Sequence, residues 1–120
     1  MGCALARAHS WVGKASRVVY WGDIDADGYA ILAHVRRTLD RRVDSMLMDS
    51  GTFETHQRYG VRIDHRGKAV GAQYVPDVAA VLTQSEREVY SRITAPGYNG
   101  PLRVEQERIR LDVVSQSLCG

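Results

Sequence analysis

Cysteine is scarce in this sequence, and long apolar runs are missing. The two cysteines, Cys3 and Cys119, stand near opposite ends of the 120 residues without a CxxC spacing. We therefore expect free thiols in a reducing cytoplasm. Arg7, His9 and Ser10 interrupt the N-terminal stretch, so it does not have the apolar core of a signal peptide. The composition also excludes a membrane-spanning chain, and we expect no membrane partner.

Acidic residues are absent before Asp23, and lysine is almost absent throughout. Lys14 and Lys68 are the only lysines among 16 basic residues, and the net charge is only +2. Arginine suits bidentate contacts with phosphate, although a solvated arginine-rich surface has the same composition. Hydrophobic residues make up 44% and charged residues 25% of the chain. These values are ordinary for one folded domain of this length and exclude a disordered chain.

An apolar run that ends in alternating aspartates is the most informative stretch of the sequence. Residues 18–22 are β-branched, aromatic or small, and Asp23, Asp25, Asp27 and Gly28 follow them. The apolar run predicts a buried strand, and the spacing of apolar residues after Gly28 predicts a helix. The aspartates therefore fall at a strand-to-helix turn, which is where open α/β sheets bind their ligands.

Helical periodicity is clearest over Tyr29–Thr38. Its apolar residues form one packing stripe, made of Ile31, Leu32, Val35 and the adjoining Leu39. Asp25 or Asp27 would stand at the N-terminus of this helix, where a carboxylate caps free amides, and we expect Asp27 to serve only as a cap. Arginines gather toward the other end, at Arg36, Arg37, Arg41 and Arg42.

A second strand is predicted over Val43–Met48, and a helix over Phe53–Tyr59 follows it. Strand, helix and strand in this order predict a right-handed parallel crossover. Asp49 comes directly after the second strand. It would therefore lie at the same sheet edge as Asp23.

Turn and capping residues mark the remaining elements. A hairpin is expected around residues 65–68, and Thr83 and Glu86 have the spacing of a capping box that opens a helix ending near Ile93. Over residues 102–111 the apolar phase changes, and we favour a strand there. We expect a single domain with an N-terminal segment over residues 1–16, a core over 17–114 and a soft terminus over 115–120.

Three kinds of site use carboxylates in this pattern. The aspartates and Gly28 match the start of an EF-hand loop, but its twelfth position is His34 where a bidentate glutamate is needed. A phosphatase of the haloacid dehalogenase type would use Asp23 as nucleophile together with a later lysine, for which Lys68 is available. The third reading is a magnesium site of Asp23 and Asp25 that holds a phosphodiester.

Helix capping alone explains the cluster less well. A cap stabilises a helix by about 1 kcal/mol and needs only one carboxylate. Two carboxylates held about 4 Å apart repel by roughly 1 kcal/mol in water and by about 4 kcal/mol at a partly buried surface. Repulsion therefore cancels the gain from capping unless a cation is bound, and the pattern favours a metal site.

Several separate blocks resemble one known family in the same order. They are Tyr20–Asp25 with Gly28, Ile31–Leu32, Leu47–Asp49, Leu82–Thr83 and Arg103–Ile109. In these blocks the chain resembles the C-terminal domain of the nuclease subunit of Wadjet anti-plasmid systems. That domain has a Toprim fold similar to the one in the A subunit of topoisomerase VI. The resemblance covers about residues 17–114.

The resemblance implies an α/β fold of the Toprim-like, or Rossmann-like, type, with a mostly parallel sheet flanked by helices. It implies a cytoplasmic DNA endonuclease that depends on Mg²⁺ or Mn²⁺ and acts in defence against plasmids and other foreign DNA. The partners it implies are DNA, SMC-like subunits of a Wadjet system and a second copy of the chain.

The resemblance also assigns roles to particular residues. Asp23 and Asp25 would be the paired catalytic metal ligands, and Gly28 would allow the tight turn into the helix. Glu107, with Glu105 beside it, falls in the other recurrent block and is a further catalytic candidate, unless both glutamates only stabilise a salt-linked strand. The candidate DNA contacts are Arg36, Arg37, Arg103 and Arg108.

One feature of the Toprim pattern is missing. Toprim domains use a glutamate on an earlier strand and loop, and no acidic residue precedes Asp23 here. We therefore expect a domain without its first strand, impaired in cleavage when alone. Topoisomerase-type cleavage would also need a tyrosine from another domain, because Tyr20 lies within a strand. The alternative function is a non-catalytic DNA-binding or scaffold module that retains the fold.

Overall fold

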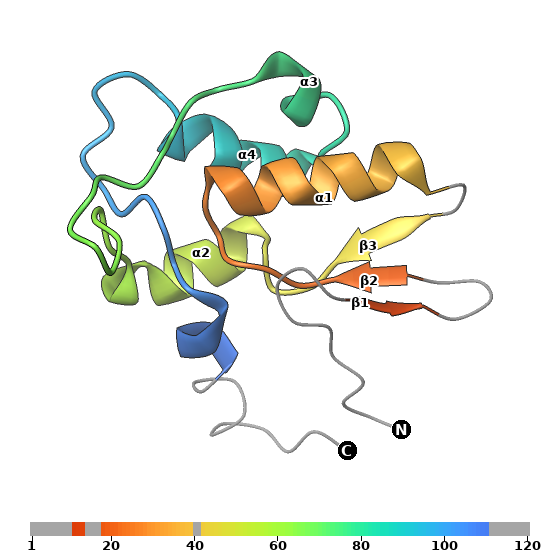
Figure 1. Cartoon of the computed structure of the whole chain (residues 1–120), viewed down its shortest axis with the longest axis horizontal. Coiled ribbons are helices and arrows are strands. Elements are labelled where there is room, and N and C mark those ends of the chain that lie inside the picture. Colours follow the sequence, from red (N-terminus) through yellow and green to blue (C-terminus); the bar gives the residue numbers. More distant parts are fainter. Residues whose placement is uncertain (1–10, 14–17, 40–41, 111–120) are drawn as a thin grey trace.

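Three short strands form the sheet of this α/β chain, for which the computed structural model describes residues 11–13, 18–39 and 42–110. They are β1 (Trp11–Gly13), β2 (Val18–Tyr20) and β3 (Val43–Ser45), in the spatial order β1-β2-β3 (Figure 1). The helices are α1 (Ala26–Thr38), α2 (Ser50–His56), the 3₁₀ helix η1 (Gln57–Tyr59), α3 (Pro76–Ala79) and α4 (Gln84–Ile93). Residues 106–110 are also helical.

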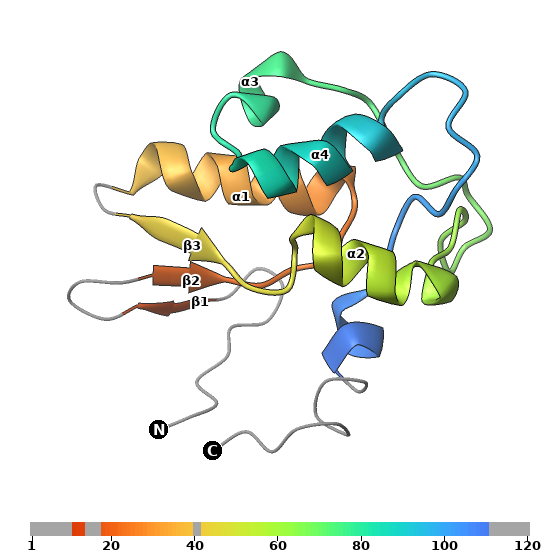
Figure 2. The same ribbon diagram turned by 180° about the vertical axis from the view of Figure 1, so that it is seen from behind.

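The helices cover one face of the sheet and the end of its parallel strands. α1 lies over the sheet and contacts β3, α3 and α4, while α2 lies beyond the ends of β2 and β3 (Figures 1 and 2). The core between these layers is apolar and aromatic, with Ile24, Tyr29, Leu32, Met48, Phe53, Val89, Tyr90, Val104 and Ile109 among its fully buried members. Every helix in the described ranges is too short or too polar to span a membrane.

The predicted strand–helix–strand unit is confirmed, with different boundaries. β2 and β3 pair in parallel, with Val18 opposite Val43. α1 begins at Ala26 and α2 at Ser50, each three residues earlier than predicted. The reason is the same in both cases: an aspartate just before the helix, Asp25 or Asp49, accepts hydrogen bonds from first-turn amides and extends the helix backward.

The described sheet is mixed, whereas a mostly parallel sheet was predicted. β1 pairs antiparallel with β2, with Trp11 opposite Tyr20. It lies in the N-terminal segment over residues 1–16, which the sequence analysis placed before the core. Only four residues separate β1 from β2, and so short a connection suits antiparallel pairing because a parallel crossover needs a dozen or more. Cys3 and Cys119 lie outside the described residues.

The last described segment is a short bridge followed by a helix, so the strand predicted over residues 102–111 is wrong for most of its length. Arg103 pairs with Val61 and Val104 with Ile24 in isolated antiparallel bridges, and residues 106–110 are helical. The change in apolar phase is explained by this switch, since Val104 and Ile109 are both buried. The expected hairpin is present, with Ile63 paired to Ala69 around it.

Glu86 connects three elements of the fold. Its carboxylate accepts the backbone amide of Thr83 at 2.8 Å, which completes the predicted capping box of α4. It also accepts two hydrogen bonds from Arg36 of α1, at 2.6 and 3.1 Å, and one from Ser45 of β3. Burial alone would raise the pKa of Glu86, but the hydrogen bonds from Arg36 and Ser45 outweigh burial and lower it. The folded state therefore favours the charged form.

We expect Glu86→Gln to lower the free energy of unfolding by about 3 kcal/mol at neutral pH, because it leaves the Arg36 charge buried without its counter-ion. The glutamine keeps an acceptor for the Thr83 amide. The pKa of Glu86 is lower in the folded state than its ordinary value of 4.5. The Glu86 charge therefore stabilises the folded protein at pH values above 4.5, and this stabilisation is lost as the pH falls through the folded-state pKa.

The measurement is chemical denaturation of the wild type and the variant across this acidic range, with the exposed neighbour Glu88→Gln as control. The difference between Glu86→Gln and the wild type should shrink toward acid pH. A difference that stays constant with pH would contradict the role assigned to the charge.

Candidate functional site

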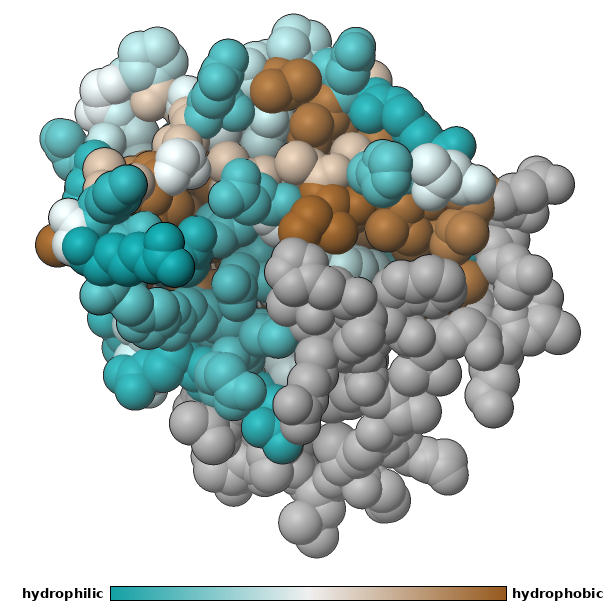
Figure 3. All heavy atoms as spheres, viewed as in Figure 1, coloured by the Kyte–Doolittle hydropathy of each residue, from teal (hydrophilic) through white to brown (hydrophobic). Residues whose placement is uncertain are grey.

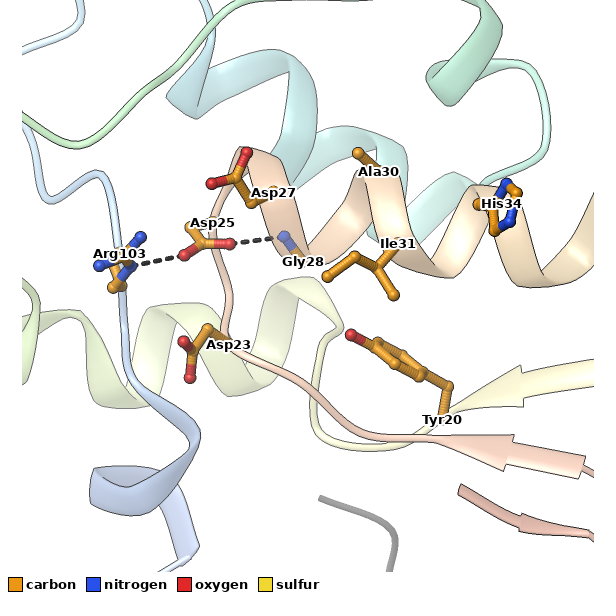
Figure 4. A pocket seen from close by; sticks show the side chains of 9 residues that line it. All are labelled: Tyr20, Asp23, Asp25, Asp27, Gly28, Ala30, Ile31, His34 and Arg103. Atoms are coloured by element: carbon orange, nitrogen blue, oxygen red, sulfur yellow. Dashed lines mark hydrogen bonds and ion pairs between the residues drawn. The ribbon is translucent and has the colours of Figure 1, made fainter. Parts of the chain in front are cut away.

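A pocket of about 480 Å³ opens where β2 leads into α1. Three carboxylates of that turn lie at one end of it, together with one arginine from the C-terminal segment (Figure 4). The residues that line it are Tyr20, Asp23, Asp25, Asp27, Gly28, Ala30, Ile31, His34 and Arg103. The pocket therefore brings together the two candidate metal ligands and one candidate DNA contact.

Asp25 is the most tightly held side chain of the pocket. It is only 2% exposed, and its Oδ1 accepts the Gly28 amide at 2.6 Å while its Oδ2 accepts Arg103 Nε at 2.5 Å. Burial raises the pKa of Asp25, the bonds from Gly28 and Arg103 act against this rise, and the charge of Asp23 adds to it. Of the two aspartates predicted at the N-terminus of this helix, Asp25 is thus the N-cap of α1. Asp27 lies within the first turn and is not the cap that it was expected to be.

The other two aspartates are more open. Asp23 accepts the backbone amide of Gln106 at 2.7 Å through Oδ1, and its second oxygen has no hydrogen bond within the described residues. Asp27 is exposed, and neither of its oxygens is engaged there. Burial alone would lower the pKa of Arg103, but the ion pair with Asp25 and the charges of Asp23 and Asp27 raise it. All three carboxylates therefore act on one guanidinium.

Gly28 is required by close approach of the backbone. A Cβ built at this position would lie 2.1 Å from the carbonyl oxygen of Asp23 and 3.1 Å from Asp25 Oδ1. The first of these atoms belongs to the main chain and cannot rotate away. The predicted role of Gly28 in the tight turn is consistent with this geometry.

The oxygen donors of the pocket suit a hard divalent cation. Mg²⁺ is commonly held by one or two carboxylates together with water and substrate phosphate. Asp23 and Asp27 offer oxygens that are free of hydrogen bonds in the described ranges, and Asp25 lies between them in the sequence. Within those ranges no group of three or more His, Cys, Asp or Glu side chains is arranged to hold a metal ion. A Mg²⁺ or Mn²⁺ ion at this pocket would therefore have at most two of these carboxylates as ligands, and water or phosphate would fill its other positions.

The remaining acidic candidates lie outside the pocket lining. Glu107 is exposed and pairs with Arg110 at 3.3 Å, and Glu105 pairs with His65 at 3.1 Å. Asp49 caps α2 by accepting Thr52 Oγ1 at 2.5 Å and the Gly51 amide at 3.1 Å. These carboxylates have structural partners of their own, and the structure does not bring them to Asp23 and Asp25.

The four arginine candidates have four different environments. Arg36 is internal and is committed to Glu86 and to the carbonyl oxygens of Val43 and Val81. Arg37 is exposed and donates to the backbone of Asp77. Arg103 is in the pocket, whereas the guanidinium of Arg108 lies 5.1 Å from the centre of the Tyr59 ring.

Sequence reasoning missed several members of the pocket. Ala30, Ile31 and His34 follow Asp27 at helical spacing, so one face of α1 could have been recognised from the sequence. The backbone amide of Gln106 carries no sequence signal at all. The sequence predicted Arg103 as a DNA contact. It did not predict the ion pair with Asp25, because the two residues are 78 positions apart.

We expect Gly28→Ala to destabilise the protein by about 1 to 3 kcal/mol, because the added methyl overpacks against the Asp23 carbonyl. An alanine elsewhere in a helix would stabilise by up to about 1 kcal/mol relative to glycine. The matched control is Gly51→Ala in the first turn of α2, where a Cβ meets only the end of the Asp49 side chain at 3.1 Å. Thermal unfolding of both variants should rank Gly28→Ala lower; equal values would contradict the close approach.

We expect Arg103→Met to cost about 3 kcal/mol, because it leaves the buried Asp25 carboxylate without its counter-charge. Asp25→Asn in the same chain should restore part of the loss, since asparagine still caps the helix without a charge. The measurement is a double-mutant cycle by chemical denaturation. Losses that simply add would show that the pair contributes no coupling energy.

Comparison with known proteins identifies the family of this chain. The family model described as Wadjet protein JetD, C-terminal, matches residues 1–118. No curated protein sequence matches the chain. The chain therefore belongs to the family of Wadjet protein JetD C-terminal domains, and this membership indicates a role in the Wadjet defence system together with other Wadjet proteins.

Proposed function

We propose that this chain is a DNA endonuclease domain that depends on a divalent metal and acts in a Wadjet system. The observation that carries the proposal is the grouping of Asp23, Asp25 and Asp27 with Arg103 around one pocket. When all three carboxylates are ionised, the single guanidinium leaves two negative charges uncompensated among these four residues. A divalent cation matches that charge, and a phosphodiester is the substrate that oxygen-bound Mg²⁺ most often serves.

The chain's own residues would divide the work as follows. The Gln106 amide orients Asp23 through one oxygen and leaves the other for a cation. Gly28 and Arg103 hold Asp25 in a fixed orientation beside it. A bound Mg²⁺ or Mn²⁺ would act as a Lewis acid on a phosphate oxygen. Arg103 is 19% exposed at its side chain and also presents positive charge to a phosphate that enters the pocket.

A second candidate function is a DNA-binding or scaffold module without catalysis. Both oxygens of Asp25 already accept hydrogen bonds, and among the described residues no group of three or more His, Cys, Asp or Glu side chains is arranged to hold a metal ion. These two observations favour a structural aspartate. A phosphatase of the haloacid dehalogenase type has less support, because Lys68 lies on the hairpin and does not line the pocket. SMC-like subunits and a second copy of the chain remain predicted partners.

We expect the purified chain to nick or linearise supercoiled plasmid with Mg²⁺ or Mn²⁺, and Asp23→Asn to reduce this rate at least 100-fold. Asp25→Asn should reduce it as well. The matched control is Asp49→Asn, since this aspartate also caps a helix after a parallel strand but lies outside the pocket lining. Agarose-gel assays with and without EDTA measure the effect.

The proposal fails if the folded wild type does not cleave DNA with either metal, which would favour the scaffold function. It also fails if cleavage persists in both Asp23→Asn and Asp25→Asn. A loss of equal size in Asp49→Asn would show that capping, and not the pocket, controls the activity.

A further inference from the structure

Two exposed arginines lie over one aromatic ring outside the pocket lining. The guanidinium carbons of Arg58 and Arg108 are 4.8 and 5.1 Å from the centre of the Tyr59 ring. Arg58 also donates to the Tyr59 hydroxyl at 2.9 Å. We call Arg58, Tyr59 and Arg108 the tyrosine clamp. It joins η1 to the helical residues 106–110, which are distant in sequence.

Neither arginine of the clamp has a carboxylate partner in the described part of the chain. Two other arginines differ in this respect, because Arg110 pairs with Glu107 and Arg92 pairs with Glu54. Contact with the ring holds each guanidinium in place through cation–π attraction while its N–H groups stay accessible. Fixed and exposed arginines are the usual means of binding phosphate in a bidentate way.

The clamp and the acidic pocket share one segment of backbone. Gln106, whose amide holds Asp23, is two positions from Arg108. Val61, which is two positions after Tyr59, donates its backbone amide to the carbonyl of Arg103 at 2.9 Å. Gly60 packs closely against Pro101. A Cβ added to Gly60 would lie only 2.2 Å from the Cβ of the proline. The segment over residues 101–108 therefore carries Arg103 into the pocket and Arg108 onto the clamp.

The hairpin beside the clamp adds further positive charge. Arg66 and Lys68 are exposed on it, and their backbone amides hold Asp64 at 2.8 and 3.0 Å. In Figure 3, hydrophilic residues gather on the left of the molecule, the side on which Figure 1 draws α2 and this hairpin. This surface thus carries four spaced basic side chains, Arg58, Arg66, Lys68 and Arg108, together with the carboxylates of Asp64 and Glu107. Spaced positive charges suit a long polyanion more than a single small anion.

We propose that the tyrosine clamp binds the sugar-phosphate backbone of duplex DNA and directs the strand toward the acidic pocket. The inference rests on the proposed function for the choice of DNA as ligand, but the binding itself requires no metal and no cleavage. Arg58 and Arg108 would each contact phosphate, and Tyr59 would act as a positioning residue that holds both.

Binding of the full chain to a short duplex in EDTA tests the proposal, with fluorescence anisotropy measured over a series of salt concentrations. Each phosphate contact contributes about 0.9 to the slope of log affinity against log salt. We expect Arg58→Gln and Arg108→Gln each to reduce the slope by about that amount and to weaken binding several-fold. Tyr59→Leu should weaken binding similarly although it removes no charge.

The matched control is Arg42→Gln, which removes one positive charge at an arginine that is 83% exposed but lies at the start of β3 and pairs with Asp44. This variant should bind DNA like the wild type. Equal weakening in all the arginine variants would overturn the clamp in favour of net charge. Failure of the wild type to bind duplex DNA at low salt would overturn the proposed DNA binding outright. Binding of a polyglutamate peptide as tight as that of DNA, with the same dependence on the arginines, would overturn it as well.

Binding and cleavage separate this proposal from the proposed function. DNA binding that depends on Arg58 and Arg108, in a chain that does not cleave, supports the clamp and contradicts the nuclease. Cleavage that depends on Asp23, with binding unchanged in both arginine variants, supports the nuclease and overturns the clamp.

Discussion

The ion pair between Arg103 and Asp25 is the contact on which the site depends. It joins a turn after β2 to a segment 78 positions later, at 2.5 Å and with the Asp25 carboxylate buried. Neighbouring backbone bonds support it, since Ile24 and Val104 exchange hydrogen bonds at 2.9 Å in both directions. Removing one partner of a buried ion pair strongly destabilises a protein. The pair therefore holds the turn and the C-terminal segment together, and both of its residues line the pocket.

The three aspartates of the turn have different physical roles although they alternate evenly in sequence. Asp25 faces the protein, caps α1 and is neutralised by Arg103. Asp23 is oriented by the Gln106 amide and keeps one oxygen free within the described ranges, while Asp27 is exposed. Repulsion between such close charges is reduced by one internal arginine. The proposed divalent cation would balance the two charges left over.

A single segment of backbone relates the acidic and basic regions of this domain. Residues 101–108 pass from Pro101, packed on Gly60, through Arg103 in the pocket to Arg108 over Tyr59. Any change in this segment therefore acts on both regions. In the function proposed above, such coupling would align a bound DNA strand with the carboxylates.

The sequence by itself determined the elements whose signals are local. A continuous run of β-branched and aromatic residues predicted β2, helical spacing predicted α1, and the Thr83–Glu86 spacing predicted the capping box. These patterns reflect contacts within about four residues. It also placed Asp23, Asp25 and Gly28 at one turn. Only the tertiary structure decided that Arg103 neutralises Asp25, that Arg36 pairs with Glu86, and that Glu107 lies outside the pocket. Those contacts join residues 50 or more positions apart, and packing of the whole chain, not any local pattern, determines which of many arginines and carboxylates meet.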